Sequence, residues 1–220
     1  MATIPACTLA QLLRKALIAP AVSSQLCHFL DWAAEIKHEE LVCTHLSACL
    51  KSSGIPSKRE VKVGVNSRKV DIVINKELIE AKYHYEGDLL EIELALRNGT
   101  AFKASNWNSA AKNILTELDR GDGTFLLWHV CIRSLTPPST TQYKLPDLIK
   151  RFYSCSRAST LPSAVLAAEN FIDLTLFPLF LARRPGLQMH CLPGIQANYS
   201  HLISRLYHIP KLPPPPQCTS

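Results

Sequence analysis

The chain has 220 residues, of which 47% are hydrophobic and 19% charged, and its formal net charge is +6. This length and composition exclude a disordered or fibrous chain and are typical of one well-packed domain, with room for an appended subdomain. The basic excess is compatible with a polyanionic partner, but by itself it is too small to indicate one.

Eight cysteines occur without a Cys-x-x-Cys pair or a Cys/His finger pattern. Cys43, His45 and Cys49 come nearest to a metal site, but they lie in a predicted helix, where residues six apart do not converge. We therefore expect mostly buried free thiols and a cytoplasmic location. No run reaches the ~18 to 20 consecutive apolar residues of a membrane helix, so no contact with a membrane is expected.

The sequence of the first quarter of the chain predicts helices. A capping box opens a helix over residues 8–18, and Pro20 ends it. Ser23 or Ser24 can cap a second helical region that reaches about residue 52, and an internal break in it is left open.

The next segment predicts a three-stranded antiparallel meander. Residues 60–65 alternate polar and apolar side chains, as a half-buried strand does. Residues 69–74 and 78–83 are rich in the apolar residues of strands, and tight turns are expected at 66–67 and 75–76.

Two helices and a strand are expected after the meander. An acidic amphipathic stretch over residues 87–96 predicts the first helix, and Ser105 caps the second, over about 106–119. The nearly continuous apolar run 124–132 predicts a strand that is buried on both faces.

Pro137 and Pro138 mark a boundary in the sequence. We expect one domain over residues 1–135, a mixed and mostly helical C-terminal extension over 136–210, and a disordered proline-rich tail over 211–220. The helices expected in the extension lie near residues 146–154, 162–172 and 197–207.

Three charged residues stand inside the predicted meander. Glu80 and Lys82 project from one face of the third strand, and an antiparallel pairing can set Asp71 of the second strand beside Glu80. Two adjacent carboxylates repel each other, and a divalent cation such as Mg²⁺ relieves the repulsion. The backbone carbonyl of Ala81 offers a further ligand, and Lys82 could polarise a water molecule or stabilise charge on phosphorus.

The order helix, three strands, helix and strand, with Asp71 followed by Glu80-Ala81-Lys82, resembles the PD-(D/E)XK restriction-endonuclease-like superfamily. The resemblance covers roughly residues 35–132, and Val70 replaces the family's nominal proline. It implies an α/β fold with a restriction-endonuclease-like core and Mg²⁺-dependent hydrolysis of DNA phosphodiesters, with Mn²⁺ expected to substitute. Asp71 and Glu80 would bind the metal, and Lys82 would assist hydrolysis.

The resemblance also implies that an acidic residue of the first core helix adds to the metal site. Val42, Leu46 and Leu50 form an apolar stripe, and Glu39 lies on the same face three residues before Val42. We therefore expect Glu39 to be the auxiliary catalytic acid and metal ligand, with Glu35 as the second choice.

Four residues are expected to contact nucleic acid. Lys112 and Asn108 lie one turn apart on the second core helix, where the family often has polar or basic side chains. Arg68 and Lys69 belong to a basic hairpin that could meet phosphates. The alternatives are an exposed helix lysine and charges that protect a sheet edge.

Two other functions stay open beside the nuclease. The chain could be a catalytically silent nucleic-acid-binding or assembly module with the same fold, or an unrelated α/β interaction protein with an accidental Glu-x-Lys match. DNA is the expected substrate and RNA is left open, as is the formation of a homodimer.

Overall fold

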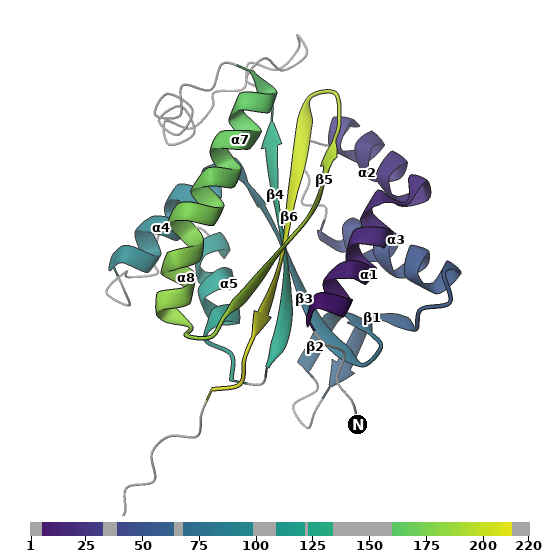
Figure 1. Cartoon of the computed structure of the whole chain (residues 1–220), viewed down its shortest axis with the longest axis horizontal. Helices are drawn as coiled ribbons and strands as arrows, with labels where there is room; N and C mark the ends of the chain where they lie inside the picture. Colours follow the sequence, from purple (N-terminus) through teal and green to yellow (C-terminus); the bar gives the residue numbers. More distant parts are fainter. Residues whose placement is uncertain are drawn as a thin grey trace, which may run out of the picture.

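A mixed six-stranded sheet runs through the middle of the molecule, with helices on both of its faces (Figure 1). The structure is a computed structural model and describes residues 6–32, 39–63, 68–98, 109–121, 123–133 and 160–212. The three layers confirm the predicted α/β class.

In chain order, the helices and strands are α1 Ala6–Ile18, α2 Pro20–Trp32, α3 Glu39–Ser52, β1 Ser57–Val63, β2 Arg68–Ile74, β3 Glu77–Tyr85, α4 Glu86–Asn98, α5 Ser109–Leu118, β4 Thr124–Arg133, α7 Leu161–Phe171, the π-helical turn η2 Ile172–Leu176, α8 Phe177–Arg183, β5 Gln188–Gln196 and β6 Ser200–Ile209.

The strand order in the sheet is β1-β2-β3-β4-β6-β5. β1, β2 and β3 form the predicted antiparallel meander, and β4 then pairs with β3 in the parallel direction. Asn75 and Lys76 both have positive φ in the tight turn between β2 and β3, as a two-residue hairpin turn requires. The meander and the strand after it are confirmed.

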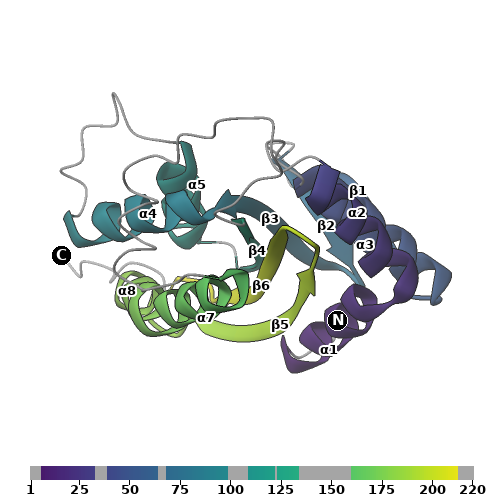
Figure 2. The same ribbon diagram turned by 90° about the horizontal axis from the view of Figure 1, so that it is seen from above.

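Residues of β4 alternate between two separate hydrophobic cores. Phe125 and Leu127 pack in the core under α1, α2 and α3. Leu126 and Trp128 pack in the core under α4, α5, α7 and α8. Figure 2 shows the two groups of helices on opposite sides of the sheet. The prediction that this strand is buried on both faces is confirmed.

The N-terminal helices agree with the predicted segments, with one change of boundary. α2 begins at Pro20, before the two serines expected to cap it, because proline fits the first helical turn, where its missing N–H has no partner to lose. The predicted turn at 66–67 and the first residues of the helix expected over 106–119 lie outside the described residues.

The prediction of a helix over residues 197–207 is wrong, because this segment forms most of strand β6. Its apolar residues follow a helix-like spacing, but β6 lies between β4 and β5 and is buried on both faces. Such a strand shows no alternation of polar and apolar residues. The helix expected at 162–172 is confirmed as α7, and the one at 146–154 lies outside the described residues.

The C-terminal strands belong to the same sheet as the meander. β6 pairs with β4 along its whole length, from Thr124↔Ile209 to Arg133↔Ser200. β5 forms the far edge, where the guanidinium of Arg14 donates to the Cys191 carbonyl oxygen at 2.9 Å and so covers part of that edge.

α7, η2 and α8 join into one helix from Leu161 to Arg183, which by length and composition alone could cross a membrane. Core helices pass the same test. The inner side of this helix contributes Ala168, Ile172 and Phe180 to the core over β4 and β6. The absence of membrane contact stays a prediction.

The described cysteines include two buried free thiols, Cys43 and Cys131. Burial raises the pKa of each thiol to about 12. Both therefore behave as small apolar side chains. Of the other described cysteines, Cys27 and Cys49 are half-buried and Cys191 is exposed, so the expectation of mostly buried thiols holds only in part.

Candidate active site

Strands β2 and β3 pair only near their shared turn and then separate. Their last backbone partners are Ile72 and Ile79, and the same register places Asp71 opposite Glu80 one residue further on. From Ile79 to Tyr85, β3 pairs with β4 on its other side. The sheet therefore forks at Asp71 and Glu80, in the register expected from the sequence.

Three backbone amides on the open edge of β3 donate to carboxylates rather than to a neighbouring strand. The pairs are Ala81 N with Asp71 Oδ2 at 2.8 Å, Tyr83 N with Glu39 Oε2 at 3.2 Å and Tyr85 N with Asp88 Oδ2 at 3.0 Å. Alternate residues of a strand turn their amides and carbonyls to the same edge. The carbonyl of Ala81 therefore faces the fork together with its amide.

Asp71, Glu80 and Lys82 project from the face of the sheet that carries α5. Their neighbours Ile72 and Ile79 point the other way, into the core under α1, α2 and α3. The two strands thus bring three ionisable groups to one place without a loop between them.

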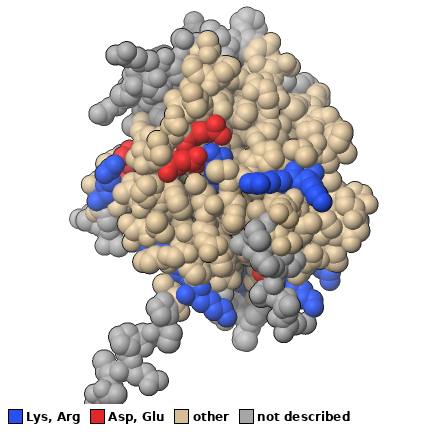
Figure 3. Space-filling model, in the orientation of Figure 1, with Lys and Arg blue, Asp and Glu red and all other residues tan. Residues whose placement is uncertain are grey.

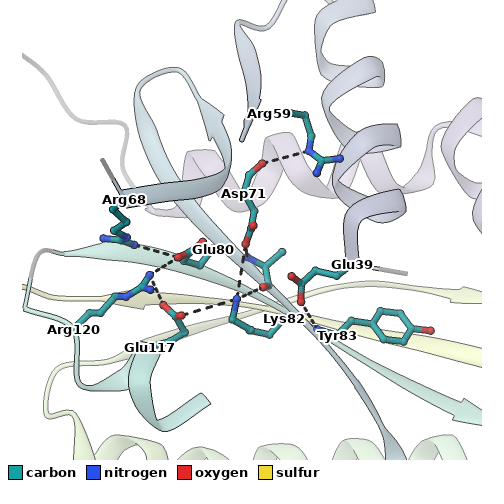
Figure 4. A network of polar contacts seen from close by, with 10 residues as sticks. Glu39, Arg59, Arg68, Asp71, Glu80, Lys82, Tyr83, Glu117 and Arg120 are labelled. Carbon is teal, nitrogen blue, oxygen red and sulfur yellow. Dashed lines mark hydrogen bonds and ion pairs between the residues drawn. The ribbon is translucent and has the colours of Figure 1, made fainter. Parts of the chain in front are cut away.

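Figure 4 shows how α5 and the residues just after it complete this cluster. Lys82 Nζ lies 3.9 Å from Asp71 Oδ2 and 3.9 Å from Glu117 Oε1, and it donates to the Ala81 carbonyl oxygen at 2.7 Å. Arg120 Nη1 lies 2.5 Å from Glu80 Oε1 and 2.5 Å from Glu117 Oε2.

A second guanidinium reaches Glu80 from the start of β2. Arg68 Nη2 lies 3.6 Å from Glu80 Oε1, and the exposed fraction of the Glu80 side chain is only 7%. Three acids and three bases therefore share a largely buried volume, where their charges interact more strongly than on the surface.

The two strand carboxyl groups shift each other's pKa. Burial, followed by the hydrogen bond and the charge of Glu80, raises the pKa of Asp71 to about 7, against the lowering effect of the Ala81 amide. Burial would also raise the pKa of Glu80, but hydrogen bonds with Arg120 and Asp71 hold it below its usual value. Burial raises the pKa of Glu117 as well. Such opposed shifts are typical of functional sites.

The backbone of β1 is strained beside the fork. Glu60 has φ 48° and makes no register pair with β2, between the pairs Arg59↔Ile72 and Val61↔Val70. A glutamate at positive φ is uncommon, and such residues cluster at functional sites. On the adjoining residue of β1, Arg59 Nη1 donates to the Glu40 carbonyl oxygen at 2.6 Å, which ties the strand to α3.

The donor set at the fork fits a hard divalent cation. Two adjacent carboxylates and a carbonyl oxygen, those of Asp71, Glu80 and Ala81, are the oxygen ligands that Mg²⁺ accepts while keeping several waters. Within the described part of the chain, no three His, Cys, Asp or Glu side chains are gathered into a ready metal-binding group. In this structure Glu80 is held by Arg120 and Arg68.

Glu39 reaches the open edge of β3 but not the two strand carboxylates, because its side chain accepts from Tyr83 N, two residues beyond Ala81. After burial, the charges of Asp71 and Glu39 both raise the pKa of the Cys43 thiol. Glu35, the second choice, lies outside the described residues.

The predicted nucleic-acid-binding residues are separated in the structure. Arg68 joins the cluster. Lys69 is exposed on β2 and pairs with Glu60 at 3.5 Å. Lys112 is exposed on α5, and Asn108 lies outside the described residues.

Glu117 and Arg120 are the cluster members that the sequence analysis did not select. The sequence contains a weak signal. A negative charge in the last turn of a helix is repelled by the helix dipole, so an acid at this position indicates a nearby base that compensates it. Glu117 is such an acid, and its Arg120 partner follows at the three-residue spacing of a helix surface pair.

Comparisons with known proteins gave no match to a family model, to a curated protein or to a solved structure.

Proposed function

We propose that this chain is a Mg²⁺-dependent nuclease that hydrolyses DNA phosphodiester bonds. The observation that supports this most is the fork between β2 and β3, which gathers Asp71, Glu80, the Ala81 carbonyl and Lys82 on one face of the sheet. When bound, the cation would activate a water molecule and neutralise charge on the phosphate.

Asp71 and Glu80 are the cation's carboxylate ligands in this proposal, and Ala81 supplies a backbone oxygen. In this structure Lys82 donates to the Ala81 carbonyl oxygen and lies 3.9 Å from both Asp71 and Glu117. A cation that takes the Ala81 oxygen would leave the Lys82 ammonium group beside Asp71 and Glu117. It can position the attacking water or stabilise the charge that develops on phosphorus.

Substrate would approach from the β1–β2 edge. Lys58, Lys62 and Lys69 are exposed there, and Arg68 continues this row of bases into the cluster. On the face seen in Figure 3, acidic and basic atoms form only small separate groups. The exposed lysines of this edge, of which Lys69 is paired with Glu60, are the bases that would meet the phosphates of a nucleic acid.

One observation favours the silent nucleic-acid-binding module as a second candidate. Arg120 and Arg68 already neutralise Glu80, so the cluster is electrostatically satisfied with no cation. In such a module the same bases would bind phosphates and no bond would be cleaved.

The two candidates are separated by incubating the purified chain with supercoiled plasmid, linear duplex and single-stranded DNA, with Mg²⁺ or with EDTA. We expect cleavage with Mg²⁺ only, and Asp71→Ala and Lys82→Ala should each reduce it by at least about a hundredfold. Glu93→Ala and Lys51→Ala, surface changes on α4 and α3, are the matched controls. Cleavage that survives both site changes would contradict the proposal, and binding without cleavage would support the silent module.

A further inference from the structure

Arg120 makes two short contacts from one nitrogen atom. Its Nη1 lies 2.5 Å from Glu80 Oε1, on β3, and 2.5 Å from Glu117 Oε2, in the last turn of α5. The side chains of both acids are at least nine-tenths buried. The guanidinium therefore bridges a strand carboxylate that the proposed function assigns to a cation and a helix carboxylate that it does not.

The bridge has a consequence for the order of binding. A carboxylate oxygen that accepts a hydrogen bond from a guanidinium is less available to a cation, since both compete for the same lone pairs and the positive charges repel. A cation at Asp71 and Glu80 must therefore weaken the contact between Arg120 and Glu80. Glu117 remains as a second carboxylate in ion-pair contact with Arg120, so Arg120 would stay at the site.

We propose that Arg120 is a latch that exchanges Glu80 for a substrate phosphate when the cation binds, with Glu117 holding it in both states. This inference rests on the proposed function, because it requires the cation at Asp71 and Glu80. A guanidinium presents several N–H donors in a planar fork, so one edge can remain on Glu117 while another meets a phosphate.

Arg68 does not fit this role, although it also approaches Glu80. Its Nη2 lies 3.6 Å from Glu80 Oε1, beyond hydrogen-bond distance, and it comes from the first residue of β2 rather than from α5. Arg68 carries the same charge toward the same carboxylate without the short contact. It therefore provides a control for charge alone.

The first test measures Mn²⁺ binding by isothermal titration without DNA. Arg120→Gln removes the competitor, and we expect Mn²⁺ to bind about tenfold or more tightly than in the unmodified chain, the size expected for one charge-assisted hydrogen bond. Arg68→Gln should tighten binding clearly less. Circular dichroism and thermal unfolding check that each variant folds, and the double change Glu117→Gln with Arg120→Gln avoids leaving Glu117 buried without its base.

Equal gains in Arg120→Gln and Arg68→Gln would overturn the latch, since charge alone would then explain both. Failure of the proposed function would look different. In that case the unmodified chain would bind no Mn²⁺, or Asp71→Asn and Glu80→Gln would leave Mn²⁺ binding unchanged. Either result would contradict both the proposed function and the latch.

The second test asks whether Arg120 gains a contact with a DNA phosphate when the cation binds. In a Lys82→Ala background, which prevents cleavage, the dissociation constant of a fluorescent duplex is measured at matched ionic strength with EDTA or with Mn²⁺. Arg120→Gln should weaken DNA binding severalfold more with Mn²⁺ than with EDTA, because only the cation frees the guanidinium. An equal loss under both conditions would overturn the exchange.

Discussion

Asp71 and Glu80 face each other across the fork of β2 and β3, one residue beyond the last backbone pair of the two strands. The carboxylate of Asp71 takes the place of the missing strand partner by accepting from Ala81 N at 2.8 Å. The same side chain therefore has a structural acceptor role and a proposed ligand role, and substitutions can separate the two.

Asp71→Asn and Asp71→Ala should both abolish cleavage but differ in stability. Asparagine keeps an oxygen for the Ala81 amide and removes the repulsion from Glu80, so its free energy of unfolding should match or exceed that of the unmodified chain. Alanine leaves the amide without its acceptor, which costs about 1 to 3 kcal/mol. Urea unfolding measures the difference, and equal stability of the two variants would contradict the acceptor role.

The buried His129 predicts a pH dependence of stability. It is fully buried, with Nδ1 2.8 Å from Ser204 Oγ, and burial lowers its pKa to about 3. The unfolded chain binds a proton on this histidine below about pH 6.5, whereas the folded chain does not until about pH 3. Its contribution to stability is therefore present above pH 6.5 and is lost as the pH falls, by about 1.4 kcal/mol per pH unit.

His129→Gln keeps a partner for Ser204 and removes this titration. Between pH 6 and pH 4 the free energy of unfolding should fall less steeply in His129→Gln than in the unmodified chain. The difference in slope should be about 1.4 kcal/mol per pH unit, the value for one titrating proton. His28→Gln, an exposed position on α2, is the control. Parallel slopes in all three proteins would show that His129 titrates normally in the folded state.

The buried Arg205 should depend on its partner in the π-helical turn. Its Nε and Nη2 each donate to an Asp173 oxygen at 3.0 Å, while the Arg205 side chain is only 4% exposed. Asp173→Ala should cost about 2 to 4 kcal/mol, with Glu169 giving partial compensation, because it leaves a buried charge without its main partner.

Replacing both partners, with Arg205→Met and Asp173→Leu, should recover much of that loss in thermal or urea unfolding. If the single change Asp173→Ala is harmless, the π-helical turn is not needed to neutralise Arg205.

Two of the predicted nucleic-acid contacts, Arg68 and Lys112, should behave differently. Arg68→Ala removes a base from the cluster, so it should weaken duplex binding and reduce the slope of log affinity against log salt by about one. Lys112→Ala, exposed on α5, should change neither quantity appreciably. Fluorescence anisotropy at several salt concentrations measures both, and a larger effect at Lys112 would place the DNA over α5 instead.

The parts of the site that could be predicted from the sequence are those set by strand geometry. Alternation along β3 puts Glu80 and Lys82 on one face, and the short turn after Ile74 fixes the register that brings Asp71 opposite Glu80. Neither inference needs tertiary contacts, which is why both agree with the structure.

The parts that could not be predicted depend on how separate elements pack. Glu117 faces Lys82 because of how α5 sits on the sheet, and Arg120 meets Glu80 across forty positions of sequence. The sequence of β6 indicates a helix because its apolar residues have a helix-like spacing, while its polar Ser204 and Arg205 are buried with partners on β4 and η2. A sequence pattern shows neither packing nor partners.

The open edge of β3 has a consequence for hydrogen exchange. Amides of Glu80, Lys82 and His84 turn toward β4 and its continuous ladder, whereas those of Ala81, Tyr83 and Tyr85 end on side-chain carboxylates. Side-chain acceptors are released by small local openings that leave a ladder intact. Protection measured by NMR should therefore alternate residue by residue along this one strand, and the fast-exchanging amides should mark the edge of β3 that β2 leaves open.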